Sequence, residues 1–381
     1  MTADALAFRQ DDADFHVEPA RSYTIPARYY YDPAIYELET EAIFFKGWWL
    51  AGHQSQLATP GCYITTRIFD QTIAVIRGED GALRAFYNVC QHRGHELLQG
   101  AGSTPVIVCP YHAWSYRLDG SLRRARNSQD MPDFDPADFG LSPVQVEEFC
   151  GFVFVNLDPA AAPLARQSGG LGSEIRHYVP RIDDLTFARR YEYRVESNWK
   201  VLIDNFLECY HCAPAHKDFV ELVDMPSYRS KAQGIYSSHI SSKMCVNDKA
   251  VYKVDPASAE FGFAGWYLWP NLTMGVLPGE PNLFMLQMIP DGPEHTIEYW
   301  DWYLLDPTPS AQIEEAMAYV HETLQPEDIG ICESVQRGLR SRGYNQGRFV
   351  VDKGLTELSE HAVHHFQQMV VEALGVQPTG G

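Results

Sequence analysis

The spacing of hydrophobic and polar residues changes along the chain, and these changes predict its elements. Apolar residues at helical spacing follow Asp32 and Pro33, an N-cap residue and a first-turn proline, and Gly47 ends the run. From residue 48 to residue 157 the pattern is that of short β-branched and aromatic strands separated by Gly-containing turns. This region therefore predicts a small all-β domain.

A stretch rich in Asp, Pro, Ala, Gly and Ser predicts a junction between domains at 157–173. Beyond it the pattern predicts three strands and four helices, at 189–195, 283–289 and 296–305 and at 198–210, 311–324, 327–339 and 360–374. This mixture is typical of an α+β domain. We therefore expect four segments: an N-terminal arm and helix at 1–47, the all-β domain at 48–157, a linker at 158–188 and the α+β domain at 189–381.

The composition limits the function classes. With 45% hydrophobic and 21% charged residues, the chain is typical of a globular protein, and no apolar run is long enough to span a membrane. A formal net charge of −20 argues against a nucleic-acid partner. The acidic N-terminus resembles no export signal, and eight cysteines are too few for a disulfide scaffold. We therefore expect a reducing, cytoplasmic location, where clustered cysteines are first interpreted as metal ligands.

A first candidate metal site combines two cysteines with two histidines. Cys90 and His92 form a C-x-H pair, and after sixteen residues Cys109 and His112 form a C-x-x-H pair. Each pair follows a predicted strand at a tight turn, so two loops are expected to enclose one centre. Because each loop supplies one Cys and one His, the pattern favours a Rieske [2Fe–2S] cluster over a structural zinc site, in which like ligands usually pair. Zinc and a chance grouping are the alternatives.

A second candidate site begins in the predicted helix at 198–210, which Ser197 can cap. Asp204, Glu208 and His211 are spaced i, i+4 and i+7, which predicts that they share one helix face. Pro214 cannot continue the helix, so His216 is expected to fold back toward His211. Two histidines with one carboxylate form the site of non-haem Fe(II) oxygenases.

The missing carboxylate is sought at the start of the helix near residue 327. Glu327 and Asp328 follow Pro326, and each is a candidate for the third ligand. The alternative is that both acids only interact favourably with the dipole at the N-terminus of this helix. The residues alone leave this choice open.

The segments CQHRGHELL and CPYHAW resemble the Rieske motif of aromatic-ring-hydroxylating and related oxygenases, with Gln91 where proline is commonest. The resemblance implies an all-β Rieske domain joined to a catalytic domain with a helix-grip-like antiparallel sheet. In this family the motif E-D-x-x-x-x-E-S-V-Q supplies the third iron ligand, which implies Asp328 beside His211 and His216. Glu327 and Asp204 are the fallback ligands. The resemblance also implies a homotrimer in which Glu208 bridges to a cluster histidine of the neighbouring subunit.

The segments RAFYNVC, DNFLECYHC and ESVQRGLRSRGY are most similar to the group that contains carnitine, glycine betaine and choline monooxygenases, and the similarity runs from about residue 25 to 370. These enzymes use O₂ to hydroxylate a carbon next to a quaternary nitrogen, which releases an aldehyde and a tertiary amine. The chain has no Gly-rich dinucleotide motif, so electrons from NAD(P)H are expected through a separate flavin/iron–sulfur reductase. Residues 261–288 depart from the carnitine enzymes and more nearly suggest the choline or betaine enzymes.

A quaternary ammonium ion has no hydrogen-bond donor, so aromatic faces are expected to bind it. The candidate cage residues are Phe206, Tyr210, Phe263, Trp266, Tyr267 and Trp269. The alternative is that these aromatic residues belong to the core. At the level of function, the alternatives are an aromatic-ring-hydroxylating dioxygenase alpha subunit, a Rieske electron carrier without catalysis and a zinc-stabilised structural protein.

Overall fold

The computed structural model describes residues 14–243, 249–254 and 262–380, and the chain forms two compact units. The β unit comprises Phe44–Gln167, and the sheet–helix unit comprises Met1–Ile43 and Ser168–Gly381. The N-terminal helix and residues 168–188 of the predicted linker therefore group with the sheet–helix unit. In the described part of the chain, no helix is both long enough and apolar enough to cross a membrane.

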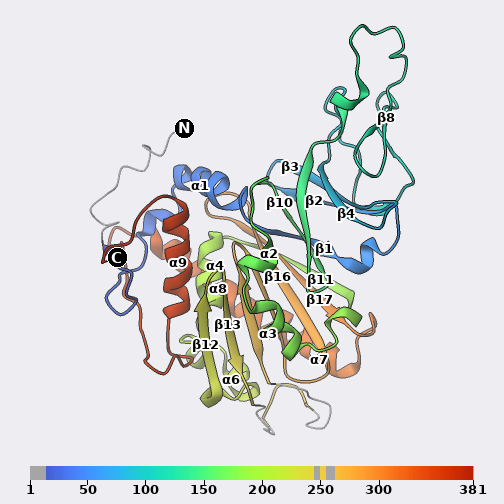
Figure 1. Ribbon diagram of the computed structural model, residues 1–381. Helices are drawn as coiled ribbons and strands as arrows, with labels where there is room; N and C mark the ends of the chain where they lie inside the picture. The colour runs from blue at the N-terminus through green and yellow to red at the C-terminus, as the bar shows by residue number, and fades with distance from the viewer. Residues whose placement is uncertain (1–13, 244–248, 255–261, 381) are drawn as a thin grey trace. The chain divides into compact units, whose positions relative to one another are not determined.

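The β unit contains a seven-stranded antiparallel sheet in the order β1-β10-β9-β4-β3-β2-β5 (Figure 1). Its strands are β1 (Trp49–His53), β2 (Cys62–Ile68), β3 (Gln71–Arg77), β4 (Leu83–Tyr87), β5 (Ala101–Ser103), β9 (Pro143–Phe149) and β10 (Phe152–Asn156). A second sheet contains β6 (Ile107–Val108), β7 (Ser115–Tyr116) and β8 (Leu122–Arg124). The all-β prediction is confirmed. Residues 88–100 join β4 to β5, and residues 109–114 join β6 to β7.

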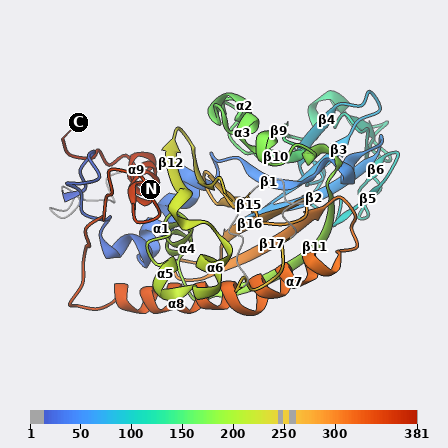
Figure 2. The ribbon, with the colours of Figure 1, turned by 90° about the horizontal axis from the view of Figure 1, so that it is seen from below.

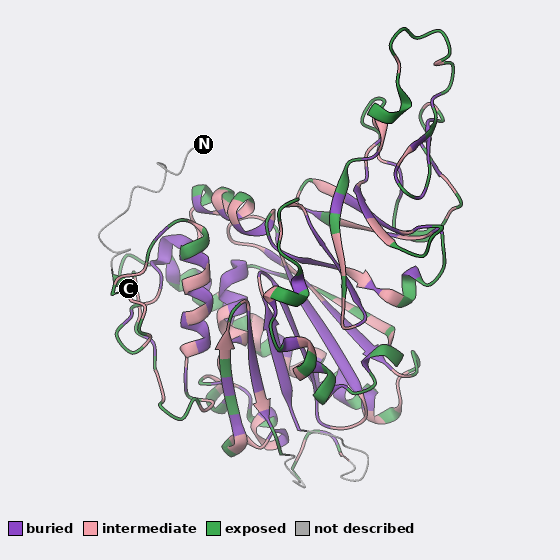
Figure 3. Ribbon diagram, viewed as in Figure 1, coloured by how far each residue is buried: buried purple, intermediate pink, exposed green. Residues whose placement is uncertain are grey.

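The sheet–helix unit contains a second seven-stranded antiparallel sheet, in the order β11-β17-β16-β15-β14-β13-β12. Its strands are β11 (Thr186–Val195), β12 (Tyr228–Gln233), β13 (Tyr236–Ser241), β14 (Ala264–Leu268), β15 (Leu272–Val276), β16 (Asn282–Pro290) and β17 (Thr296–Leu304). Strands β14 and β15 are buried throughout their length (Figure 3). The predicted α+β class is confirmed.

Helices precede, interrupt and follow the strands of this sheet along the chain. They are α1 (Pro33–Glu39), α3 (Leu171–Tyr178), α4 (Trp199–Phe206), α5 (Cys212–Ala215), α6 (Lys217–Leu222), α7 (Ala311–Tyr319), α8 (Gln325–Leu339) and α9 (His361–Ala373), while α2 (Leu164–Gln167) lies in the β unit. Helix α4 packs against α8, α9 and β16. Figure 2 shows α7 and α8 as one continuous helix, joined by a π-helical turn at Val320–Leu324.

A buried ion pair fixes the start of α4. Lys200 Nζ lies 2.6 Å from Glu39 Oε1, and both side chains are fully buried. The indole N–H of Trp199 donates to the other Glu39 oxygen at 2.9 Å. Because the acid belongs to α1, these contacts attach the N-terminal helix to the element that leads into the second candidate site.

Two predictions about helix α4 are wrong. The helix ends at Phe206 rather than at residue 210, so Glu208 and His211 do not share an α-helical face with Asp204. The N-cap residue is Asn198, whose side chain accepts from Lys200 N, whereas the sequence suggested Ser197. The early end matters for function because it leaves Glu208 and His211 in a turn, where side-chain directions no longer follow the helical period.

Candidate metal centres and adjoining cavity

The two loops of the first candidate site are built alike. The N–H of Cys90 donates to the carbonyl of His95, and the N–H of Cys109 donates to the carbonyl of Trp114, each at 2.8 Å. In each loop a second bond returns to the cysteine carbonyl from a residue with positive φ, Gly94 or Ala113. These tight turns place both cysteines in the core of the β unit, where their side chains are buried.

The four predicted cluster ligands converge in the β unit. The imidazole rings of His92 and His112 lie 4.7 Å apart, and His92 stacks on Trp114. Burial raises the pKa of the Cys90 thiol, and the neighbouring Cys109 thiol adds to this effect. Among the described residues, Nδ1 of His112 is buried and has no hydrogen-bond partner. Two free thiols beside two imidazoles, one with an orphaned nitrogen, fit the donor set of a Rieske [2Fe–2S] cluster.

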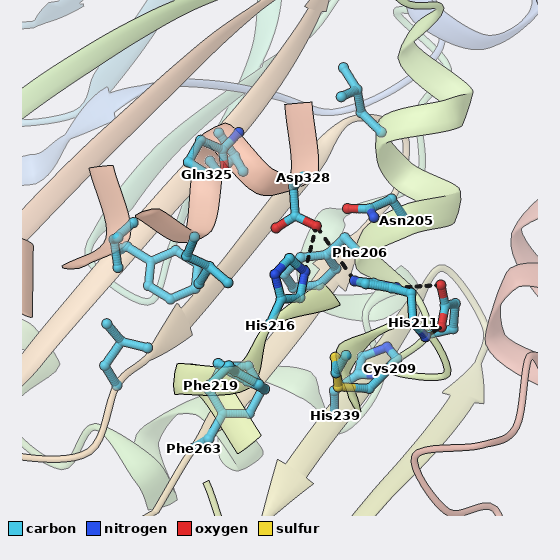
Figure 4. A pocket seen from close by; sticks show the side chains of 18 of the residues that line it. Asn205, Phe206, Cys209, His211, His216, Phe219, His239, Phe263, Gln325 and Asp328 are labelled. Atoms are coloured by element: carbon cyan, nitrogen blue, oxygen red, sulfur yellow. Dashed lines mark hydrogen bonds and ion pairs between the residues drawn. A yellow bond between two sulfur atoms is a disulfide. The ribbon is translucent and has the colours of Figure 1, made fainter. Parts of the chain in front are cut away.

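The second candidate site brings together two histidines and one aspartate. Nε2 of His216 lies 3.0 Å from Oδ1 of Asp328, and Nε2 of His211 lies 3.5 Å from the same oxygen. Figure 4 shows the three side chains pointing toward one another, and their candidate ligand atoms lie within 4.8 Å of one another. The donor set fits a 2-His-1-carboxylate iron site. The ligand roles stay a prediction, but the geometry is the one they require.

The opposite charges of these groups shift the pKa values of His211 and Asp328. Burial lowers the pKa of His211, but its contacts with Asp328 and Glu208 outweigh burial and raise that pKa to about 10. Burial raises the pKa of Asp328, but the hydrogen bonds from His211 and His216 outweigh it and hold that pKa at about 2. Asp328 is therefore ionised, as an anionic metal ligand needs to be, and it lies between the two imidazoles.

The outer nitrogens of the two histidines are held by carboxylates. Nδ1 of His211 lies 2.5 Å from Glu208 Oε1, and Nδ1 of His216 lies 2.8 Å from Glu327 Oε2. Such contacts fix the ring orientation and the tautomer that leaves Nε2 free to bind a metal. Glu327, a fallback ligand in the sequence analysis, is therefore placed behind His216 rather than at the centre.

Asp204, the other fallback ligand, lies in a separate network. Its Oδ2 accepts from the hydroxyl of Tyr30 at 2.6 Å and from the amide of Gln367 at 3.1 Å. Burial raises the pKa of Asp204 to about 7. The structure therefore groups Asp204 with the N-terminal segment and α9, and not with the two histidines.

The turn around His211 contains a disulfide that the sequence analysis did not expect. Cys209 and Cys212 are bonded to each other, and both are buried. Helix α5 begins at Cys212 and includes Pro214, so the chain changes direction at His216 rather than at the proline. The C-x-x-C spacing could have indicated this bond, but the low number of cysteines argued against disulfides.

A cavity adjoins the three converging side chains. Its lining includes apolar and aromatic residues from α4, α6, the strands and the residues flanking them, and the π-helical turn. These are Leu202, Phe206, Phe219, Phe263, Leu277, Phe284, Leu286, Met288, Trp300, Val320 and Leu324. Its polar lining consists of Asn205, Glu208, His211, His216, Tyr228, His239, Glu298, Gln325 and Asp328. The cavity thus combines aromatic walls with carboxyl groups beside the candidate iron site.

Two of the six predicted cage residues, Phe206 and Phe263, line this cavity. The other four, Tyr210, Trp266, Tyr267 and Trp269, are absent from its lining. Tyr210 is 48% exposed, and the alternation of β14 directs Trp266 to the other face, where its N–H donates to Glu174. The hydroxyl of Tyr267 donates to the carbonyl of Pro270.

Sequence analysis missed Phe219, Phe284 and Trp300. In β16 and β17, Leu286 pairs with Trp300 and Met288 pairs with Glu298. Residues two apart on a strand share a face, so Phe284 belongs to the same set. The strand period at 282–304 could therefore have indicated this part of the cavity wall.

Comparisons with known proteins agree with both sites. A family described as "Ring hydroxylating alpha subunit (catalytic domain)" matches residues 182–375, and one described as "Rieske [2Fe-2S] domain" matches residues 47–135. The carnitine monooxygenase oxygenase subunit of Acinetobacter baumannii is 38% identical over 361 residues, 94% of this chain and 97% of the relative. The chloroplastic choline monooxygenase of Beta vulgaris is 32% identical over 369 residues, covering 95% and 79%.

A solved structure gives the same relationship in three dimensions. The quaternary ammonium Rieske monooxygenase CntA, in complex with its substrate L-carnitine, superimposes with a TM-score of 0.85. It is 37% identical in sequence and covers 96% of this chain and 99% of its own. The similarity therefore extends over both units.

Proposed function

We propose that this chain, which belongs to the family of Rieske-type ring-hydroxylating oxygenase alpha subunits, is the terminal oxygenase of a monooxygenase that acts on quaternary ammonium compounds. It is a Rieske-type non-haem iron oxygenase. The observation that carries the substrate proposal is the cavity, which places aromatic rings and acidic side chains beside His211, His216 and Asp328. Aromatic faces and negative charge are what a cation without donors requires.

In this proposal the two cofactors belong to separate units. Cys90, His92, Cys109 and His112 would hold a [2Fe–2S] cluster, and the 2-His-1-carboxylate group would hold one Fe(II). When bound, the cluster passes single electrons and the iron activates O₂. One oxygen atom enters a C–H bond next to the cationic nitrogen, and the other leaves as water with two electrons and two protons. The hydroxylated product then separates into an aldehyde and a tertiary amine.

Glu208 is the proposed bridge between the centres of neighbouring subunits in a homotrimer. Its Oε1 contacts His211 Nδ1, and its Oε2 accepts from the backbone N–H of the same residue at 3.1 Å. The side chain is therefore fixed against one iron ligand by two contacts. We propose that it connects His211 to a cluster histidine of the neighbour.

Charge supports docking between subunits. Arg126 lies beside the two cluster histidines at a hollow of the β unit. A second cavity reaches Glu208 and His211 in the sheet–helix unit, and its other acids are Asp204 and Glu360. The basic rim of one copy and the acidic cavity of another are complementary, which favours formation of the pair.

A substrate screen with a surrogate flavin/iron–sulfur reductase and NADH tests the proposal. Carnitine, γ-butyrobetaine, glycine betaine, proline betaine and choline are supplied in turn, and aldehyde and tertiary amine are measured. We expect product from at least one of them. A control with His211→Ala should keep the cluster absorbance and give no product. Failure with all five compounds, together with cis-diol formation from an aromatic hydrocarbon, would favour the ring-hydroxylating dioxygenase alternative.

The bridging role has its own test. We expect Glu208→Gln to keep the cluster and the mononuclear iron but to slow oxidation of the reduced cluster in single-turnover experiments. Glu372→Gln, the same change at an exposed position of α9, serves as the comparison. Normal cluster oxidation in Glu208→Gln would show that electrons take another route.

A further inference from the structure

The cavity beside the candidate iron site contains carboxyl groups but no lysine or arginine among its described lining residues. The acidic side chains of this lining are Glu208, Glu298 and Asp328. The two internal segments outside the described residues, 244–248 and 255–261, contain no Lys, Arg or His. The histidine of the lining that lies outside the metal group, His239, is fully buried, and burial lowers its pKa to about 3, so it is neutral.

Glu298 is the acid in this lining that neither candidate metal role involves. It lies on β17, is 1% exposed, and its Oε2 accepts from the amide of Gln325 at 2.6 Å. None of the ion pairs found among the described residues includes Glu298. Burial raises its pKa to about 8, and the nearby charge of Asp328 adds to this effect. A buried carboxyl without a cationic partner is unfavourable when ionised, so a cation in the cavity would stabilise it.

The wall next to Glu298 is aromatic and has one unused donor. Trp300 lies two residues further along β17, on the same face, and its ring centroid is 4.9 Å from that of Phe284. Trp300 is 5% exposed, and its indole N–H has no acceptor among the described residues. A ring face can bind a quaternary ammonium ion, and a free N–H can donate to a neutral hydroxyl oxygen.

We infer that the cavity selects quaternary ammonium substrates whose other end is uncharged, such as an alcohol, over zwitterions that carry a carboxylate, and that Glu298 determines this selectivity. The inference rests on the proposed function. A carboxylate in this cavity would be desolvated beside Glu298 and would meet no basic side chain of the described lining. A cationic alcohol meets an acid, aromatic faces and a donor. L-carnitine and γ-butyrobetaine, the substrates of the solved relative, both carry a carboxylate.

Matched substrate pairs test the selectivity. Choline and glycine betaine differ only in a terminal alcohol or carboxylate, and L-carnitine and its amide differ in the same charge. With the holoenzyme and a surrogate reductase, we expect kcat/KM to be at least about tenfold higher for the cationic member of each pair. Isothermal titration of the cluster-containing protein with each compound should give the same order of Kd. Preference for the carboxylates would overturn the inference and leave the proposed function intact.

Glu298→Gln tests the residue. The amide keeps the size of the side chain and can still accept from Gln325, so the cluster absorbance and Tm should change little. We expect the choline-to-betaine ratio of kcat/KM to fall at least about fivefold, chiefly through a lower KM for glycine betaine, because the like-charge penalty against its carboxylate is lost. Glu315→Gln, the same change at an exposed position of α7, should keep the wild-type ratio.

A second variant covers the case in which Glu298→Gln does not fold. Trp300→Phe removes the free donor but keeps an aromatic ring, and it should lower kcat/KM for choline more than for ethyltrimethylammonium, which lacks the hydroxyl. An unchanged ratio in a folded Glu298→Gln enzyme, or equal losses in Trp300→Phe, would remove these residues from substrate selection. If none of the quaternary ammonium compounds binds or is turned over, the proposed function itself is wrong.

Discussion

The adjacent acids Glu327 and Asp328 contact different nitrogens of His216, so their removal should affect iron binding differently. Asp328 contacts Nε2 of both histidines, whereas Glu327 contacts Nδ1 of His216 alone. Loss of a carboxylate behind a metal-binding histidine costs about 10–100-fold in metal affinity, or about 1.4–2.7 kcal/mol. The Glu327 side chain is 40% exposed, so we expect Glu327→Ala to lower Fe(II) affinity by about tenfold, the lower end of this range.

Asp328→Ala should have a larger effect, because it removes the carboxylate that contacts Nε2 of both histidines and leaves two imidazole nitrogens to bind Fe(II). We expect Fe(II) affinity to fall by more than about 100-fold, beyond the range for outer partners. The assay is anaerobic titration with Fe(II) in competition with a chromogenic chelator, with cluster absorbance as the measure of intact protein. Glu322→Ala, an exposed acid on the preceding helical turn, is the matched control and should bind iron like wild type.

The order of the two effects decides the assignment. If Glu327→Ala loses its iron while Asp328→Ala keeps it, the third ligand is Glu327 and the contacts in the structure rearrange on metal binding. If both variants bind iron like wild type, neither acid belongs to the centre. In either case the reasoning from the shared Asp328 oxygen is refuted.

Three further predictions concern buried groups. Lys200→Met should destabilise folding by about 3–5 kcal/mol in chemical unfolding, because it leaves Glu39 buried and unpaired, and adding Glu39→Gln should restore most of the loss. Burial holds the pKa of His239 at about 3, below its unfolded value, so the free energy of unfolding decreases as pH falls. Between about pH 7 and about pH 5, we expect wild type to lose about 2 kcal/mol more of this free energy than His239→Gln, as measured by chemical unfolding. Tyr116→Phe removes the hydroxyl 3.2 Å from Cys90 Sγ, and redox titration should find a lower cluster potential; an unchanged potential would argue against Cys90 as a ligand.

Local patterns were enough to predict the fold class and the cluster site. The strands of the β unit are short and separated by turns with Gly, and both cysteine loops are contiguous segments whose shape depends on bonds within six residues. The candidate ligand residues Cys90, His92, Cys109 and His112 could therefore be predicted together from spacing alone.

The second site could not be resolved in this way, because its geometry depends on contacts far apart in the chain. Glu327 and Asp328 are adjacent, and only packing of α8 against α4 decides which of them faces His211. No Gly or Pro marks the end of α4 at Phe206, so the helix predicted from periodicity extends four residues too far, to residue 210.

Strands β12 and β13 were also missed, for a different reason. β12 has the sequence YRSKAQ and β13 the sequence YSSHIS, which combine many polar residues without a clear alternation. The buried polar residues of β13 are satisfied by side-chain partners, as when His239 contacts the hydroxyls of Tyr228 and Ser237. Because hydropathy does not record such partners, a buried polar strand resembles a loop in the sequence.

The candidate iron ligands and the cavity wall lie on different elements, so one fold can keep its metal centre while its substrate changes. The two histidines follow α4 in the chain and the aspartate lies on α8, whereas the cavity wall formed by Leu286, Met288, Glu298 and Trp300 belongs to β16 and β17. Side chains on this wall can change without moving the chain segments that hold the ligands. A hydrogen bond between the two parts is donated by Gln325, one helical turn before Asp328, to Glu298. Through this contact we expect substrate charge near Glu298 to affect the position of Asp328, so selectivity and iron geometry need not vary independently.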